Sequence, residues 1–295
     1  MSQAQLPDTG RYYVPHDSLW PIVASVSLFT VMLGAITFLN GWVGAWSFLP
    51  GVLLLAVTFF GWFGRVIDEN QQGIYNQQVD RSFRMGMMWF IFSEVMFFAA
   101  FFGALFYART FSTAWLGGRG VKLFTNLVLW PHYDGVWPTN GPGHVGGKAD
   151  GSFEVVPAFG VPAINTLILL TSGVTVTIAH HALRENKRGI LKVFLALTFL
   201  LGFTFVGMQA HEYGEAYREL GLRLSTGIYG STFFMLTGFH GLHVTIGAIM
   251  LLVMWLRVLR GHFTPGSHFA FEGVAWYWHF VDVVWLGLFV FVYWL

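Results

Sequence analysis

The sequence predicts an all-α integral membrane protein with seven transmembrane helices. Of its 295 residues, 55% are hydrophobic and only 11% are charged, whereas roughly a quarter of the residues in an ordinary soluble domain are charged. The apolar residues gather into seven runs, each near the ~20 residues that a helix needs to cross a bilayer. The runs are continuously apolar rather than alternating, which excludes a transmembrane β-barrel.

The apolar runs and the polar stretches between them define the expected elements. Residues 1–18 are a polar arm without the apolar core of a signal peptide, and residues 40–45 form a tight turn that makes the first two spans an antiparallel hairpin, 19–64. An inner loop, 65–84, leads to the five later helices within 85–295. The long outer loop, 109–161, is rich in Gly and Pro. We place the spans at 19–39, 46–64, 85–108, 162–183, 190–210, 228–256 and 274–295.

The distribution of basic residues predicts the orientation. Cytoplasmic loops are enriched in Lys and Arg, and a cytoplasmic N-terminus puts most of the 16 Lys and Arg residues on the inner side. The inner residues are then Arg11, Arg65, Arg81, Arg84, Arg184, Lys187, Arg188, Lys192, Arg257 and Arg260, and the outer ones Arg109, Arg119, Lys122, Lys148, Arg218 and Arg223. We therefore expect a multi-pass membrane protein with its N-terminus on the inner side and its C-terminus on the outer side.

Composition also excludes several functions. The formal net charge of +1 offers no basic patch for a nucleic acid. The chain has no cysteine, which removes disulfides, iron–sulfur clusters and thiolate metal sites. Any metal would need His and carboxylate ligands, and the expected partners are lipids and other membrane proteins.

Glu94 is the first functional candidate, because an ionisable group inside a span is costly. Its neighbours on the helix face are Phe90, Phe97, Phe98 and Phe101, and no cation shares that face. We expect the carboxyl to be protonated at neutral pH, since an uncompensated charge is disfavoured in hydrocarbon. Two interpretations stay open, a proton-handling carboxyl and a neutral acid hydrogen-bonded to an adjacent helix.

His240 and His243 lie three residues apart within the sixth span. Such a pair could ligate a metal. Thr237, Gly241 and Thr245 form a stripe of small residues around it, which favours close helix packing with interhelical hydrogen bonds. Packing is the interpretation that we prefer.

His279 and Asp282 have the same spacing in the seventh span, so the carboxylate can orient the imidazole. The pair either fixes this span against a neighbour or takes part in proton movement. Trp276, Tyr277, Trp278 and Trp285, which surround it, are expected to be packing and interface residues.

Four strings together resemble subunit III of cytochrome c oxidase, within the heme-copper oxidase superfamily. They are FIFSEVMFF (90–98), NTLILLTSGVTVTIAHHAL (165–183), YGSTFFMLTGFHGLHV (229–244) and HFAFEGVAWYWHFVDVVWL (268–286). The likeness runs from about residue 15 to the end in order and spacing. It implies a two-helix hairpin and a five-helix bundle separated by a lipid-filled cleft.

The resemblance also implies a role. Such a chain carries no heme or copper, which belong to subunits I and II, and it packs against subunit I in an enzyme that reduces oxygen to water with electrons from cytochrome c. It sustains proton uptake, limits turnover inactivation and offers oxygen a lipid-lined route. The family's carbodiimide-reactive acid falls on Glu94, and its phospholipid-contacting positions fall on Glu69, Arg84, Arg257 and His262. The outer loop is longer than in mitochondrial members, and we hypothesise that it contacts subunit II or the cytochrome c side. We expect the complex to lie in a bacterial plasma membrane.

Two other classes of membrane protein are alternatives. A membrane metalloenzyme would have to gather His240, His243, His180 and His181, but the two pairs lie at different predicted depths. A transporter would be expected to show internal repeats and paired broken helices, which we do not find in this sequence.

Overall fold

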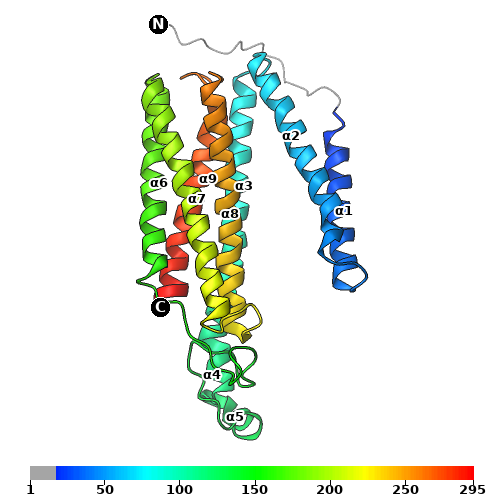
Figure 1. Ribbon diagram of the computed structural model, residues 1–295, viewed down its shortest axis with the longest axis vertical. Coiled ribbons are helices and arrows are strands. Elements are labelled where there is room, and N and C mark those ends of the chain that lie inside the picture. Colours follow the sequence, from blue (N-terminus) through cyan, green and yellow to red (C-terminus); the bar gives the residue numbers. More distant parts are fainter. Residues whose placement is uncertain (1–17) are drawn as a thin grey trace. The chain divides into compact units, whose positions relative to one another are not determined.

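The computed structural model describes residues 18–295, so almost all of the predicted polar arm lies outside the described residues. Within that range seven helices are long and apolar enough to cross a membrane, which confirms the seven predicted spans (Figure 1). They are α1 (Trp20–Leu39), α2 (Leu49–Gln71), α3 (Gln77–Tyr107), α6 (Val161–Arg184), α7 (Arg188–Arg218), α8 (Gly227–Leu259) and α9 (Phe269–Leu288).

The helices extend beyond the apolar runs that predicted them. α2 continues to Gln71 and α3 begins at Gln77, so only residues 72–76 of the predicted inner loop 65–84 are non-helical. Asn76 precedes α3, and its side-chain oxygen accepts a hydrogen bond from Val79 N at 3.0 Å, as an N-cap residue does. Hydropathy predicts which residues lie in the hydrocarbon of the membrane. Backbone hydrogen bonds extend a helix into the polar residues that follow.

The chain divides into two compact units, up to Phe83 and from Arg84 to Leu295. In the first unit α1 and α2 run antiparallel and are held together by small residues. Ser27 and Thr58 share a hydrogen bond of 3.0 Å, and Ser47 Oγ donates to Gly34 O at 2.9 Å. A Cβ on Gly34 would lie 2.5 Å from Ser47 O, so glycine is needed for this approach.

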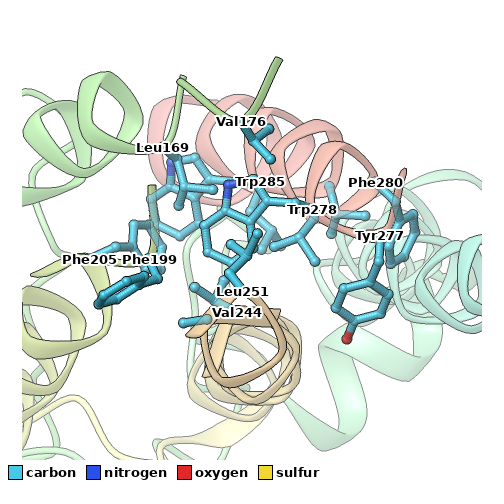
Figure 2. Close-up of a cluster of buried hydrophobic side chains, with 14 of the residues drawn as sticks. Leu169, Val176, Phe199, Phe205, Val244, Leu251, Tyr277, Trp278, Phe280 and Trp285 are labelled. Atoms are coloured by element: carbon cyan, nitrogen blue, oxygen red, sulfur yellow. The ribbon is translucent and has the colours of Figure 1, made fainter. Parts of the chain in front are cut away.

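In the second unit α6, α7, α8 and α9 pack around a core of aromatic and aliphatic side chains. The indoles of Trp278 and Trp285 lie at its centre, with α6 residues on one side and α8 residues on the other (Figure 2). Trp278 Nε1 donates to Ser172 Oγ and Trp285 Nε1 donates to Thr166 Oγ1, both at 2.9 Å. Both indoles are therefore buried without losing a hydrogen bond.

Glycines make room for the central indole. A Cβ on Gly247 of α8 would lie 2.8 Å from the Trp278 ring, and one on Gly202 of α7 would lie 2.6 Å from it. A Cβ on Gly241, in contrast, would meet nothing within 4 Å among the described residues. Close approach thus occurs at Gly247 rather than at Gly241. Thr237 of the predicted stripe does make the expected interhelical hydrogen bond, with its Oγ1 2.6 Å from Tyr213 OH of α7.

α3 joins the bundle through long aromatic side chains. Phe97 packs edge-on against Phe239 of α8 at 5.1 Å between ring centroids. Phe98 lies 6.1 Å from Phe280 of α9. These contacts place the middle of α3 beside both α8 and α9.

The segment 108–160 is more ordered than the irregular loop that we predicted for 109–161. α3 continues through a π-helical turn, Ala108–Ser112, into α4 (Thr113–Leu116), and after Gly120–Lys122 a further helix, α5, covers Leu123–Leu129. Asn126 Nδ2 contacts the carbonyl oxygens of Leu116, Trp130 and Tyr133 at 2.8 to 2.9 Å. One partly exposed amide therefore organises both sides of α5.

The later part of this segment is tied to the connection between α7 and α8. Glu154 N donates to Leu220 O at 2.9 Å, and Tyr229 N donates to Thr139 O at 3.3 Å. Hydrogen bonds from Ser152 lower the pKa of Asp150 below its usual range, which keeps that carboxylate ionised in its turn. Figure 1 shows α4 and α5 beyond this end of the bundle.

Candidate functional sites in the bundle

Glu94 of α3 and His243 of α8 form a direct contact between two ionisable side chains of different helices. Glu94 Oε2 lies 2.9 Å from His243 Nε2. The side chains are 20% and 13% exposed, respectively, so water screens the contact poorly. The sequence showed no cation on the face of Glu94 because its partner comes from a helix about 150 positions later.

Hydrogen-bond logic fixes how many protons this pair holds. His243 Nδ1 lies 2.6 Å from Phe239 O, and a carbonyl oxygen only accepts, so Nδ1 carries a hydrogen. The contact between Nε2 and Glu94 then contains a single proton. Either the carboxylic acid donates it to a neutral imidazole, or an imidazolium donates it to the carboxylate. Both arrangements have zero net charge, so the proton can move between the two residues without creating an isolated charge.

Aromatic rings surround the pair. Phe98 lies edge-on to the imidazole of His243 at 5.0 Å, and Phe97 lies 5.9 Å from it. Tyr277 OH donates to His243 O at 3.3 Å. The apolar rings limit access of water, which strengthens the hydrogen bond that they enclose.

His240 has a different environment from His243. It is fully buried, and its Nε2 donates to Val281 O of α9 at 3.2 Å. Its ring lies between Phe205 and Trp285, at 5.7 and 5.1 Å. The imidazoles of the two histidines therefore hydrogen-bond to residues of different helices, and the structure does not bring them to one centre.

His279 and Asp282 lie near α6. His279 Nδ1 is 3.8 Å from Asp282 Oδ2, and His279 Nε2 is 3.2 Å from Thr177 Oγ1. A Cβ on Gly173 would lie 2.5 Å from Asp282 Oδ2. Asp282 is thus packed against the α6 backbone, while His279 remains exposed.

The four predicted lipid-contacting residues divide between the units. In the first unit, Glu69 Oε1 accepts from Arg65 at 3.1 Å and Oε2 accepts from Tyr75 OH at 2.8 Å. In the second, Arg84 Nη1 lies 2.6 Å from Glu272 Oε2. Arg84 also lies over the ring of Phe269, 5.4 Å from its centroid.

Arg257 is unexpectedly buried. Only 5% of it is exposed, and its guanidinium lies 4.5 Å from the ring centroid of Phe263. Its carbonyl oxygen accepts from His262 N at 3.1 Å. Arg257 therefore holds the turn after α8 against the bundle, a packing role that its position near a span end did not reveal.

Sequence reasoning missed a buried polar network in α7. Glu212 is 2% exposed, and its Oε1 accepts from Gln209 at 2.9 Å and from Tyr293 OH at 2.7 Å. The predicted span ended at residue 210, which placed Glu212 outside the membrane and removed it from consideration. Gln209 and Glu212 are three residues apart and so lie on one face of a helix that continues past residue 210. This spacing could have indicated the network.

Comparison with known proteins decides the family. The family model for cytochrome c oxidase subunit III matches residues 11–125 and 120–295. The chain belongs to the cytochrome c oxidase subunit III family. Subunit 3 of the oxidase from Branchiostoma lanceolatum is 42% identical over 96% of this chain and 98% of its own length. The proteins of that name from Dugong dugon and Chondrus crispus are 40% and 39% identical, over 97% and 96% of this chain and 97% and 93% of their own lengths.

As a member of the subunit III family, the chain is part of an oxidase complex and works with other oxidase subunits. Its seven apolar helices make it an integral, multi-pass membrane protein. Large apolar side chains on the outside of the bundle are freely exposed, as Leu167, Val193 and Val283 illustrate with exposed fractions of 67%, 64% and 67%. Such surface suits lipid or an apolar subunit interface.

Proposed function

We propose that the chain is the non-redox subunit III of a proton-pumping cytochrome c oxidase, in which heme and copper belong to subunits I and II. The observation that carries this proposal is the filled centre of the bundle. Cofactor sites of helical bundles lie between facing helices, and here Trp278 and Trp285 occupy that space. His240, the histidine nearest the centre, already bonds to a backbone carbonyl.

We further propose that the chain stabilises subunit I, supports proton uptake by the complex, provides lipid and oxygen access and limits turnover inactivation. Three features support these roles. The outward apolar surface offers area for subunit I and for bound phospholipid. A proton can move between Glu94 and His243 without creating an isolated charge. Arg84 lies at the end of the bundle that carries most of its basic residues, where phospholipid head groups are attracted.

The proposed location is a bacterial plasma membrane, with the N-terminus in the cytoplasm and the C-terminus in the periplasm. The bias of Lys and Arg toward one side of the spans supports this orientation. The 108–160 segment then faces the periplasm, and we propose subunit II as its neighbour. Cross-linking from Lys122 tests this, since Lys148 is already paired with Glu154 at 2.5 Å. Failure to capture a neighbouring subunit from Lys122 would count against the contact.

The test of the non-redox role starts from the intact complex. The complex is purified in mild detergent, this chain is removed from it, and heme, iron and copper are measured in both fractions. We expect the metals to remain with the larger subunits and the separated chain to be colourless. Iron or copper bound to this chain in a one-to-one ratio would overturn the proposal.

The supporting role has its own measurement. The complex without this chain should begin turnover at a normal rate and then lose activity faster than the complete complex. Adding the chain back should restore the lifetime. An unchanged lifetime in the depleted complex would remove the protective role while leaving the non-redox assignment intact.

A further inference from the structure

Three side chains at one end of the bundle are arranged as metal ligands. His180 lies near the end of α6, His268 directly precedes α9, and Glu272 is in the first turn of α9. One ligand atom from each lies within 4.8 Å of the others, and this is the only such group of three in residues 18–295. The imidazole rings of His180 and His268 are 5.5 Å apart.

The two imidazoles have nitrogens available for an ion. His180 Nε2 and His268 Nδ1 are both buried and make no hydrogen bond with any described residue. A buried polar atom without a partner costs free energy, and two such atoms beside one carboxylate point to a missing ligand. We propose that His180, His268 and Glu272 bind a divalent transition-metal ion, with Zn²⁺ as the ion that fits best.

The donor set decides the class of ion. Two imidazole nitrogens and one carboxylate oxygen suit zinc, which commonly takes three protein ligands and leaves a fourth position for water. Calcium and magnesium prefer sets made of oxygen alone. Zinc–nitrogen bonds of about 2.0–2.1 Å require ligand atoms roughly 3.4 Å apart. The ligand atoms lie within 4.8 Å of one another, so they would close by up to about 1.4 Å around the ion.

Arg84 supports the carboxylate ligand. Its guanidinium holds Glu272 Oε2 at 2.6 Å, and a carboxylate has lone pairs for a second partner. Ligating carboxylates are commonly oriented by such an outer contact. A bound ion would join the end of α6 to the beginning of α9, and through Arg84 it would also be linked to α3. Zinc has no redox chemistry, so this site would control stability or motion at that end of the bundle rather than carry electrons.

The neighbouring histidine is a matched control. His181 follows His180 directly in α6 but is exposed, and it does not belong to the cluster. The intact oxidase complex is purified with EDTA, and Zn²⁺ binding is measured by equilibrium dialysis. We expect His180→Ala, His268→Ala and Glu272→Gln each to lose one zinc ion per complex, or to bind it about tenfold or more weakly. His181→Ala should bind as the native complex does.

Two further measurements separate lost ligation from a disturbed fold. Zn²⁺ should raise the thermal unfolding midpoint of the native and His181→Ala complexes and leave that of the three ligand variants unchanged. His268→Cys should keep the zinc, because a thiolate replaces the imidazole as a ligand. The proposal is overturned if all three ligand variants bind as much zinc as the His181→Ala control does. It is also overturned if His268→Cys loses the zinc while its heme content is unchanged.

Discussion

Glu94 Oε2 of α3 lies 2.9 Å from His243 Nε2 of α8, so one hydrogen bond between these side chains joins the two helices. Because Phe239 O already accepts the hydrogen on His243 Nδ1, the imidazole has no second acceptor position to offer. A change in either residue therefore removes the hydrogen-bond partner of the other.

Replacing Glu94 should abolish most carbodiimide labelling of the chain while heme content stays intact, because the reagent attacks a protonated carboxyl in apolar surroundings. Glu94→Gln keeps a donor for His243 Nε2, whereas Glu94→Ala leaves that nitrogen unpaired at a cost of about 1–3 kcal/mol. Labelling is measured by mass spectrometry of the complex and stability by thermal unfolding. Glu215→Gln, which removes an exposed carboxyl in α7, is the control. Native-level labelling of Glu94→Gln would show that the reactive acid is another residue.

Gly247→Ala should destabilise the bundle by about 1–3 kcal/mol, since its methyl group would overlap the Trp278 indole. Gly241→Ala, six positions earlier in α8, should be neutral or slightly stabilising, because its methyl group meets nothing within 4 Å and alanine favours a helix. Unfolding of the chain in detergent gives both values. Adding Trp278→Phe should recover part of the loss at Gly247, and strictly additive effects would argue against the predicted clash.

Arg84→Ala should lower the phospholipid bound to the complex and shorten the time for which it turns over. The substitution removes a cation and frees Glu272 from its 2.6 Å contact, so anionic head groups lose an attractive charge and meet a repulsive one. Phosphorus analysis and progress curves of oxygen consumption are the measurements. Arg81→Ala, which removes an exposed charge one turn earlier, is the control. If the amount of bound phospholipid and the duration of turnover are both unchanged, Arg84 does not bind lipid as proposed.

Arg257→Ala is expected to act on stability as well as on lipid. The guanidinium is buried over Phe263, so its loss removes both a cation–π contact and packing area. We expect a lower thermal midpoint even in fully delipidated complex. A loss of stability that appears only when lipid is present would instead favour a direct head-group contact.

Asn126→Asp should open the 108–160 segment without disturbing the bundle. The native amide donates into three carbonyl oxygens, and the carboxylate that replaces it would face all three as an acceptor. Limited proteolysis should cut this segment faster in the variant, with the circular dichroism of the helices unchanged. Lys122→Ala, at an exposed position just before α5, should be cut at the native rate.

The sequence predicts the spans well because hydropathy alone determines which segments enter hydrocarbon. The sequence predicts helix ends poorly, because hydrogen bonding extends α7 beyond its apolar run. For this reason Glu212 is not among the residues that the sequence predicts as functional. The candidate sites depend on contacts between helices. Glu94 is visible as an unusual residue in a span, but His243 becomes its partner only when α3 and α8 are placed side by side. The burial of Arg257 is likewise a tertiary property.

The hydrogen bonds of the 108–160 segment also set an order of events during synthesis. Thr139 and Glu154 leave the ribosome well before their partners, Tyr229 and Leu220, have been made. The segment therefore cannot reach its final conformation until α7 is complete and α8 has begun. During that interval its apolar side chains at Val121, Phe124 and Val128, which remain exposed even in the finished fold, are available to chaperones and assembly factors. Maturation of this part of the chain is thus coupled to the insertion of helices that follow it.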